Sequence, residues 1–155
     1  MNPGLIDASN WLHNALQASG KPTDAHRVVM DMIQRDPLYR PGIRNGVNSF
    51  INFGQQDQAL AYLERIQPLI PNDAVIQSAE AAVRSSLGEI ARSAKLSESA
   101  VALQSSNSVA RLTRSFAWMD SHQYERAAAE GEEFHPVFAL TFLGRVEEAS
   151  LLAYK

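Results

Sequence analysis

The sequence predicts an all-α protein built from a repeated pair of helices, and the spacing of its glycines is the first observation behind this prediction. Gly20, Gly54 and Gly88 lie 34 residues apart, each at the same point of a recurring pattern. A fixed period of this length is typical of stacked repeats in which each unit is a helix, a turn and a second helix. We expect about four to five antiparallel helix pairs, about nine or ten helices in all, and no strands.

Two further residue types repeat with the same period. Ala25 recurs as Ala59 and, two periods later, as Ala127, while Pro37 recurs as Pro71.

Composition agrees with a folded chain, because 45% of the 155 residues are hydrophobic and 20% are charged. Disordered segments have lower hydrophobic content than this chain. A chain of this length can also bury enough apolar surface to form a core.

Apolar residues at helical spacing predict the helices of the first two units. These helices are expected over 5–19, from Pro22 to Asp36, over 41–53 and over 56–69. Pro22 suits a first helical turn, where its missing N–H group would be unpaired in any residue. Gly20 and Gly54 are placed in the turns inside each pair, and Pro37 and Pro71 end the second helices.

The later units follow the pattern less closely. Helices are expected over 75–87, 90–101 and from Val109 onward, with Asp73 as a helix cap. Ser93 replaces the recurring alanine, and His122 stands in the turn where glycine was. The helix around Ala127 should be cut short by Gly131 and His135-Pro136, and Gly144 should begin another turn and helix. The whole chain is expected to be one repeat domain, 1–155, with units at roughly 5–38, 39–72, 73–106 and 107–135 and a partial unit at 136–155.

These residues resemble the tetratricopeptide repeat (TPR) family. The resemblance rests on the segment from Gly20 through Ala25 to Pro37 and on its echo from Gly54 through Ala59 to Pro71. It implies a right-handed α-solenoid, in which the two helices of a pair cross so closely that only a small side chain fits at Ala25 and Ala59. The family's early tryptophan and the glycine within the first helix are absent, and Val47 stands where that glycine would be in the second pair.

A second resemblance concerns the context of the chain. The segments 36–41 and 143–149 look like the helical-repeat tails of bacterial multidomain signalling proteins. In such proteins the repeats follow a nucleotide cyclase or a DNA-binding transcription regulator. This resemblance implies a bacterial regulatory or scaffold segment of a signalling protein. The cytoplasm is the default expectation for its location.

Charge and composition argue against several classes of function. The formal net charge is −3, and the basic residues are scattered without a run, so neither nucleic acid nor an anionic membrane is an expected partner. No secretion signal or membrane-spanning stretch is visible. The chain has no cysteine, which removes disulfides, thiolate metal sites and thiol catalysis.

Catalytic and metal-binding motifs are likewise not expected. The four histidines, His13, His26, His122 and His135, are not spaced three or four residues apart, as a zinc pair on one helix requires. The sequence has no glycine-rich phosphate loop and no glycine-flanked serine nucleophile. We therefore expect no enzyme activity, no catalytic residues, no metal and no cofactor, and an interaction with another protein or peptide segment instead.

The expected partner-binding surface is the inner, concave face formed by the first helices of the pairs. Its candidate residues are Asn10, Asn14, Arg44, Asn45, Asn48 and Asn52. The residues expected to define the repeat are Gly20, Ala25, Pro37, Gly54, Ala59, Pro71, Gly88 and Ala127. Trp11 and Trp118 lie among apolar neighbours on first helices, so both are expected to pack in the core.

One class of TPR partner can be tested residue by residue. Family members that bind the carboxylate tail of chaperones use two asparagines and three basic residues. Asn14 and Asn45 match the asparagines, but the basic positions are occupied by Asn10, Val75 and Ala79. Without cations at these three positions to clamp a carboxylate tail, that partner is disfavoured.

The sequence therefore predicts a protein–protein interaction module of TPR type. The alternative is a structural or assembly segment that packs on its own flanking domains. Enzyme activity is a third hypothesis, which no motif supports. The apolar residues at 151–154 have no polar helix after them to cover them, so we expect a longer array and self-association of the isolated chain through its C-terminal end.

Overall fold

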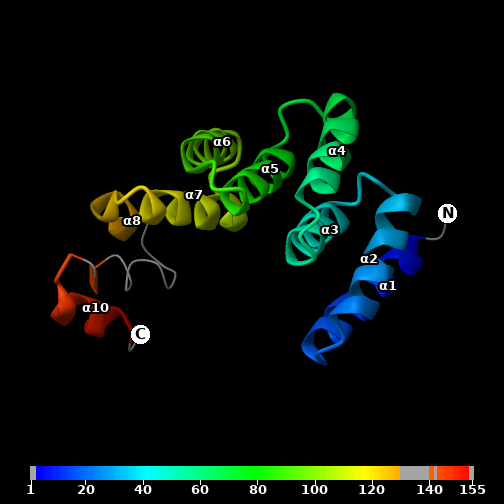
Figure 1. The fold of residues 1–155 in the computed structure, drawn as a ribbon, viewed down its shortest axis with the longest axis horizontal. Coiled ribbons are helices and arrows are strands. Elements are labelled where there is room, and N and C mark those ends of the chain that lie inside the picture. Colours follow the sequence, from blue (N-terminus) through cyan, green and yellow to red (C-terminus); the bar gives the residue numbers. More distant parts are fainter. Residues whose placement is uncertain (1–2, 130–139, 142, 154–155) are drawn as a thin grey trace. The chain divides into compact units, whose positions relative to one another are not determined.

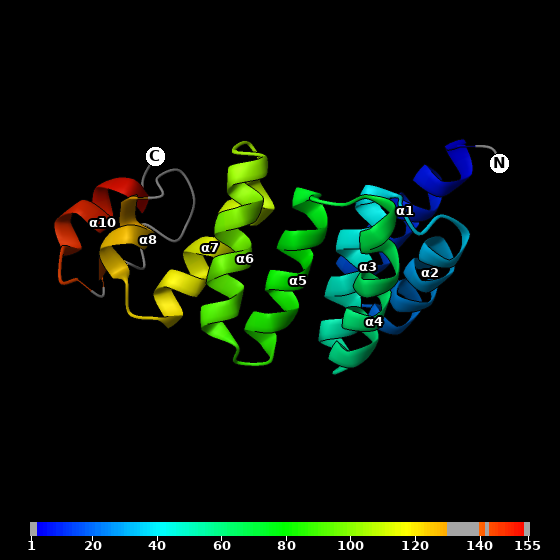
Figure 2. The same cartoon turned by 90° about the horizontal axis from the view of Figure 1, so that it is seen from above.

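The computed structural model describes residues 3–129, 140–141 and 143–153 of the chain. It divides into two compact units, Met1–Pro71 and Asn72–Lys155. The described residues form nine α-helices and one short 3₁₀ helix, and they contain no strand. Figure 1 shows the helices in chain order, and Figure 2 shows them after a quarter turn.

The first unit consists of two helix pairs. They are α1 (Pro3–Ala18), α2 (Pro22–Arg35), α3 (Arg40–Asn52) and α4 (Gln56–Ile66), followed by the 3₁₀ helix Gln67–Leu69. Each helix packs on the next one in the chain. The buried side chains of α2 follow the apolar stripe expected from the sequence, and they are Ala25, Val29, Met32 and Ile33.

The helix expected over 56–69 ends earlier than the sequence suggested. The α-helical part stops at Ile66, and Gln67–Leu69 continue as a 3₁₀ turn. Pro68 explains the change, because proline has no N–H group to donate to the carbonyl four residues earlier. The tighter 3₁₀ turn is a common way for a helix to end.

The glycines that define the period have backbone conformations that other residues rarely adopt. Gly20 and Gly54 have φ values of +69° and Gly88 has a φ value of +78°. In each turn the next residue's N–H group donates to a carbonyl five residues earlier, as in the bond of 2.9 Å from Lys21 N to Leu16 O. This is the Schellman ending of a helix, which favours glycine because the left-handed backbone crowds a Cβ atom.

His122 occupies the corresponding position in the fourth turn. Its φ value is +59°, and Gln123 N donates to Trp118 O over 2.8 Å, as in the glycine turns. The prediction that His122 is a turn residue is therefore confirmed. The turn keeps its geometry although a non-glycine residue makes the left-handed conformation less favourable.

The recurring small residues lie where the two helices of a pair cross. Ala25, Ala59 and Ala127 have no exposed surface, and neither does Ser93, which replaces alanine in the third unit. The Ser93 hydroxyl donates to Ala81 O on the preceding helix over 2.8 Å. A serine is therefore accommodated in the crossing because its polar atom is satisfied there.

Contact between α2 and α3 depends on two glycines within α3. A Cβ atom on Gly46 would lie 3.2 Å from Cγ2 of Ile33, and one on Gly42 would lie 3.1 Å from Cδ1 of Tyr39. Both distances are tighter than ordinary van der Waals contact. The glycines therefore allow the backbone of α3 to approach the side chains of α2 and of the loop between the two helices.

The second unit contains the remaining helices. They are α5 (Ala74–Ser86), α6 (Ile90–Leu103), α7 (Ser108–Asp120), α8 (Tyr124–Ala129) and α10 (Val146–Ala153). Helix α6 packs on both α5 and α7, as Figure 2 shows. Asp73 caps α5 by accepting from Val75 N over 2.8 Å, and Asn107 caps α7 by accepting from Ala110 N over 3.1 Å. The predicted Gly131 and His135-Pro136 breaks lie outside the described residues.

The middle of the second unit should be the least protected part of the chain. The buried residues of α6 are Ser93, Ser97 and Ala100, so this helix buries small and polar side chains instead of large apolar ones. Less apolar burial gives less stabilisation, and local opening then costs less free energy. We expect hydrogen exchange measured by mass spectrometry to show the weakest helical protection over 88–108. Uniform protection across all helices would contradict this expectation.

Candidate protein-binding face

Three of the asparagines singled out in the sequence come together in the first unit. Asn45 on α3 donates through Nδ2 to Asn10 Oδ1 over 2.9 Å, and the same nitrogen lies 3.5 Å from Asn14 Oδ1. Asn10 and Asn14 are on α1, so the amides join the first helices of the two pairs. Asn45 is largely buried, Asn10 is half-buried and Asn14 is exposed.

The other candidates extend this cluster along α3. Arg44, Asn48 and Asn52 are exposed and are four residues apart. Residues at this spacing lie on one side of a helix, and Asn45 lies next to them. Arg44 forms no ion pair with any residue that the structure describes. We call the surface formed by Asn10, Asn14, Arg44, Asn45, Asn48 and Asn52 the asparagine face.

The chemistry of the asparagine face suits an extended peptide. Each side-chain amide offers donors and an acceptor, and so does each residue of an extended backbone. The bond from Asn45 fixes the Asn10 amide, while Asn14, Asn48 and Asn52 reach solvent. Arg44 adds a permanent positive charge that can bind a carboxylate in two parallel hydrogen bonds.

A tyrosine and an aspartate that the sequence did not single out connect α1 to the start of α3. Tyr39 Oη donates to Asp7 Oδ1 over 2.7 Å, joining α1 to the segment before α3. Burial, followed by the hydrogen bond and the charge of Asp7, raises the pKa of Tyr39 to about 12. The tyrosine therefore stays protonated at neutral pH and keeps donating. No motif marks such a pair, because its partners are 32 residues apart.

Trp11 was expected in the core, and this expectation is wrong. Its side chain is 73% exposed, whereas Trp118 is 7% exposed and buried as expected. Helix α1 packs on α2 through its other side, which carries His13. His13 Nδ1 lies 3.0 Å from the Ala25 carbonyl oxygen and donates to it. Helical spacing shows that apolar residues share a side of α1, but not that another element covers that side.

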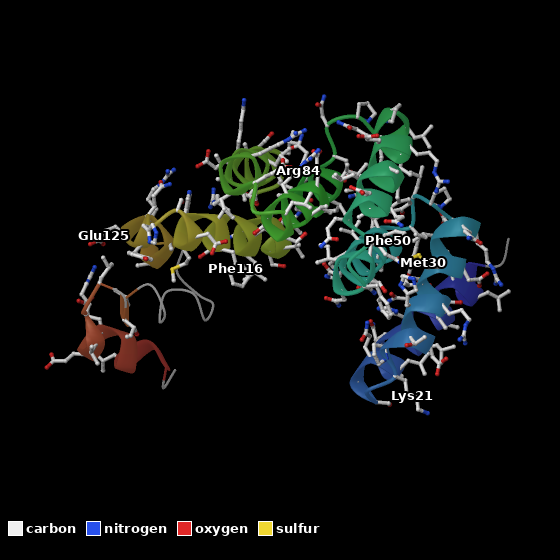
Figure 3. The ribbon with its side chains drawn as sticks, viewed as in Figure 1. Lys21, Met30, Phe50, Arg84, Phe116 and Glu125 are labelled. Carbon is white, nitrogen blue, oxygen red and sulfur yellow. The ribbon has the colours of Figure 1, made fainter. Side chains whose placement is uncertain are left out.

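His26 fills the space between α2 and α3. Its Nδ1 lies 2.8 Å from Ser49 Oγ, and its ring centroid lies 4.5 Å from that of Phe53. Figure 3 shows the neighbouring Phe50 on α3. Burial lowers the pKa of His26 below its ordinary value of 6.5. The imidazole is therefore a packing group that the folded state prefers to keep neutral.

The lowered pKa of His26 gives a pH-dependent stability with a defined sign. As the pH falls through 6.5, the unfolded chain takes up the proton before the folded chain does. The contribution of His26 is therefore complete above pH 6.5 and is lost as the pH falls below it. Urea unfolding between pH 7.5 and 5 should show a steeper fall in the free energy of unfolding with decreasing pH for the native chain than for His26→Gln. Equal slopes would contradict this assignment.

Two other features of the described residues bear on function. They contain no group of three or more histidine, aspartate or glutamate side chains placed to hold a metal ion. In the same part of the chain, no helix is both long and apolar enough to cross a membrane.

Comparison with known proteins matches this chain to solved structures. No protein-family profile matches it, and no curated protein sequence does. The thermophilic TPR protein TTC0263 of Thermus thermophilus matches with a TM-score of 0.76 at 13% identity, over 93% of this chain and 86% of that one. The first TPR domain of human RPAP3 matches with a TM-score of 0.61 at 16% identity, over 81% of this chain and 98% of that domain. The predicted all-α, TPR-type fold is therefore confirmed.

Proposed function

We propose that this TPR-type chain is a protein–protein interaction module that binds an extended segment of another protein on the asparagine face. The observation that carries the proposal is the amide cluster joining α1 and α3, in which Asn45 donates to Asn10 beside the exposed Asn14. A TPR fold brings the first helices of successive pairs together, and here the side chains at that place are amides. Amides fit a peptide backbone better than they fit an apolar ligand.

Arg44 defines the chemistry of the preferred segment. It is exposed beside the amides, and α3 carries no acidic residue that could neutralise it from the same helix. An Asp, a Glu or a terminal carboxylate of the bound segment would pair with this guanidinium. The three-cation arrangement that clamps a chaperone tail is not part of the proposal, because its places hold Asn10, Val75 and Ala79.

The wider setting in this proposal is a regulatory or scaffold segment of a larger bacterial signalling protein in the cytoplasm, such as a nucleotide cyclase or a transcription regulator. Its support is the resemblance of the segments 36–41 and 143–149 to repeat tails of such proteins. An assembly segment that binds only its own flanking domains is the alternative. The sequence of the native gene on either side of the chain separates the two, since a cyclase or DNA-binding domain favours signalling.

A selection from a random peptide library displayed on phage tests the binding proposal. We expect selected peptides to be extended and enriched in Asp or Glu, and to bind the folded chain in fluorescence anisotropy. Arg44→Ala and Asn14→Ala should each weaken binding by about tenfold, which corresponds to the loss of one charged or well-placed hydrogen bond. Lys95→Ala and Gln58→Ala remove exposed side chains elsewhere and should leave affinity unchanged. Peptides whose binding ignores Arg44 and Asn14 would refute this location.

A further inference from the structure

Helix α1 has an apolar side that no described residue covers. Leu5 is 62% exposed and Leu12 is 51% exposed, and Ala8 and Ala15 beside them are exposed as well. Trp11, also exposed, borders them. We call Leu5, Ala8, Leu12 and Ala15, with Trp11 at their edge, the α1 stripe. A contiguous apolar strip of this kind is a common sign of an interaction surface.

The α1 stripe alternates large and small residues with a heptad spacing. The two leucines are seven residues apart, as are the two alanines, and the order along the helix is Leu5, Ala8, Leu12, Ala15. When two copies of such a helix pack antiparallel, each leucine of one copy lies at the same level as an alanine of the other. Two antiparallel copies centred near residue 10 would set Leu5 opposite Ala15 and Ala8 opposite Leu12. Large side chains then fill the space above small ones, so the helices can approach closely.

The α1 stripe also carries no charge. The only ionisable side chains between Pro3 and Ala18 are Asp7 and His13. Asp7 accepts from the Tyr39 hydroxyl, and His13 is buried against Ala25 O. A charged partner would have nothing to pair with here, whereas an identical copy would meet no like charge.

We propose that the α1 stripe binds a second copy of itself, forming an antiparallel, two-fold symmetric pair of α1 helices. The same residues serve both sides, as a two-fold interface requires. Trp11 lies beside the seam, where its ring covers the partner's helix. Because one 16-residue helix offers less than the roughly 800 Å² per partner of a standard interface, the dimer is weak and forms reversibly with concentration.

Sedimentation velocity over a range of concentrations tests the proposal on the full chain. We expect a monomer–dimer equilibrium whose dissociation constant rises by about tenfold or more in Leu12→Glu, because a carboxylate would be buried in the apolar seam. Leu69→Glu is the matched control, since Leu69 is 61% exposed outside α1, and it should change nothing. Circular dichroism confirms that the variants fold, and Ala15→Glu provides a second test of the same stripe.

The C-terminal end offers a competing route of association that the same experiment separates. Leu151 is exposed on α10, so Leu151→Glu/Leu152→Glu should abolish any dimer formed through that end. Loss of the dimer in that variant but not in Leu12→Glu would overturn the proposal. A monomer at every concentration would overturn it as well.

Disulfide cross-linking tests the antiparallel geometry directly, because the chain has no native cysteine. A mixture of Leu5→Cys and Ala15→Cys chains should form a cross-linked heterodimer under mild oxidation. Leu5→Cys alone should not, because its two copies would lie about 15 Å apart along the helices. Cross-linking of Leu5→Cys alone would mean a parallel pair and would contradict the proposal.

Discussion

Replacing Trp118 with alanine is expected to lower the free energy of unfolding of the second unit by about 3–5 kcal/mol. Trp118 is buried against Ala127 and Tyr124, so truncation removes apolar contact and leaves a cavity. The guanidinium groups of Arg114 and Arg126 lie 4.8 Å and 4.5 Å from the ring centroid, and both cation–π contacts would be lost. The ring is therefore central to the packing of α7 on α8.

Trp11→Ala is the matched control for this prediction. Its ring is exposed, so in dilute solution the change should stay within about 0.5 kcal/mol. Urea unfolding followed by circular dichroism measures both variants, and hydrogen exchange assigns the loss to one unit, because two units need not unfold together. An equal decrease in the free energy of unfolding for Trp11→Ala and Trp118→Ala would show that the two tryptophans have equivalent environments. That result would contradict the structure.

The repeat was predictable because its signals are local. The left-handed turns favour glycine at positions 20, 54 and 88, and the close helix crossing favours a small residue at Ala25. Each of these residue types therefore recurs at a fixed place in the period. The 34-residue spacing of the glycines was enough to place the turns inside the first three pairs. Pro68 is an equally local signal, because its missing N–H group ends the α-helical part of α4 at Ile66.

The environment of a side chain was less predictable than its position. Trp11 and Trp118 have similar apolar neighbours in sequence, yet only Trp118 has a second helix across its ring. Which side of α1 is covered depends on the neighbouring elements, and the sequence of α1 carries no information about them. The bond between Tyr39 and Asp7 escaped prediction for the same reason, since it joins residues from two different repeat units.

The asparagine face was predictable in part: its residues could be selected from the sequence, but their burial and hydrogen bonds could not. The period placed Asn10, Asn14 and Asn45 on first helices, which was sufficient to select them. That Asn45 would be largely buried and would hold the Asn10 amide required the structure. In the proposed interaction, the residues left to contact a partner are therefore mainly Asn14, Arg44 and the exposed asparagines of α3.

Ala59→Leu is the second substitution with a large expected effect, about 1–3 kcal/mol of lost stability. Ala59 has no exposed surface at the crossing of α3 and α4, so three added carbons must displace neighbouring side chains or the helix itself. Ala61 is on the same helix but is exposed, and Ala61→Leu should change stability by no more than about 0.5 kcal/mol. Both changes keep similar helix propensity, so the difference reports the packing at position 59. Thermal melts of the two variants measure it. An equal or smaller loss for Ala59→Leu would mean that the helices of this pair do not cross at the recurring alanine, and the repeat register would have to be redrawn.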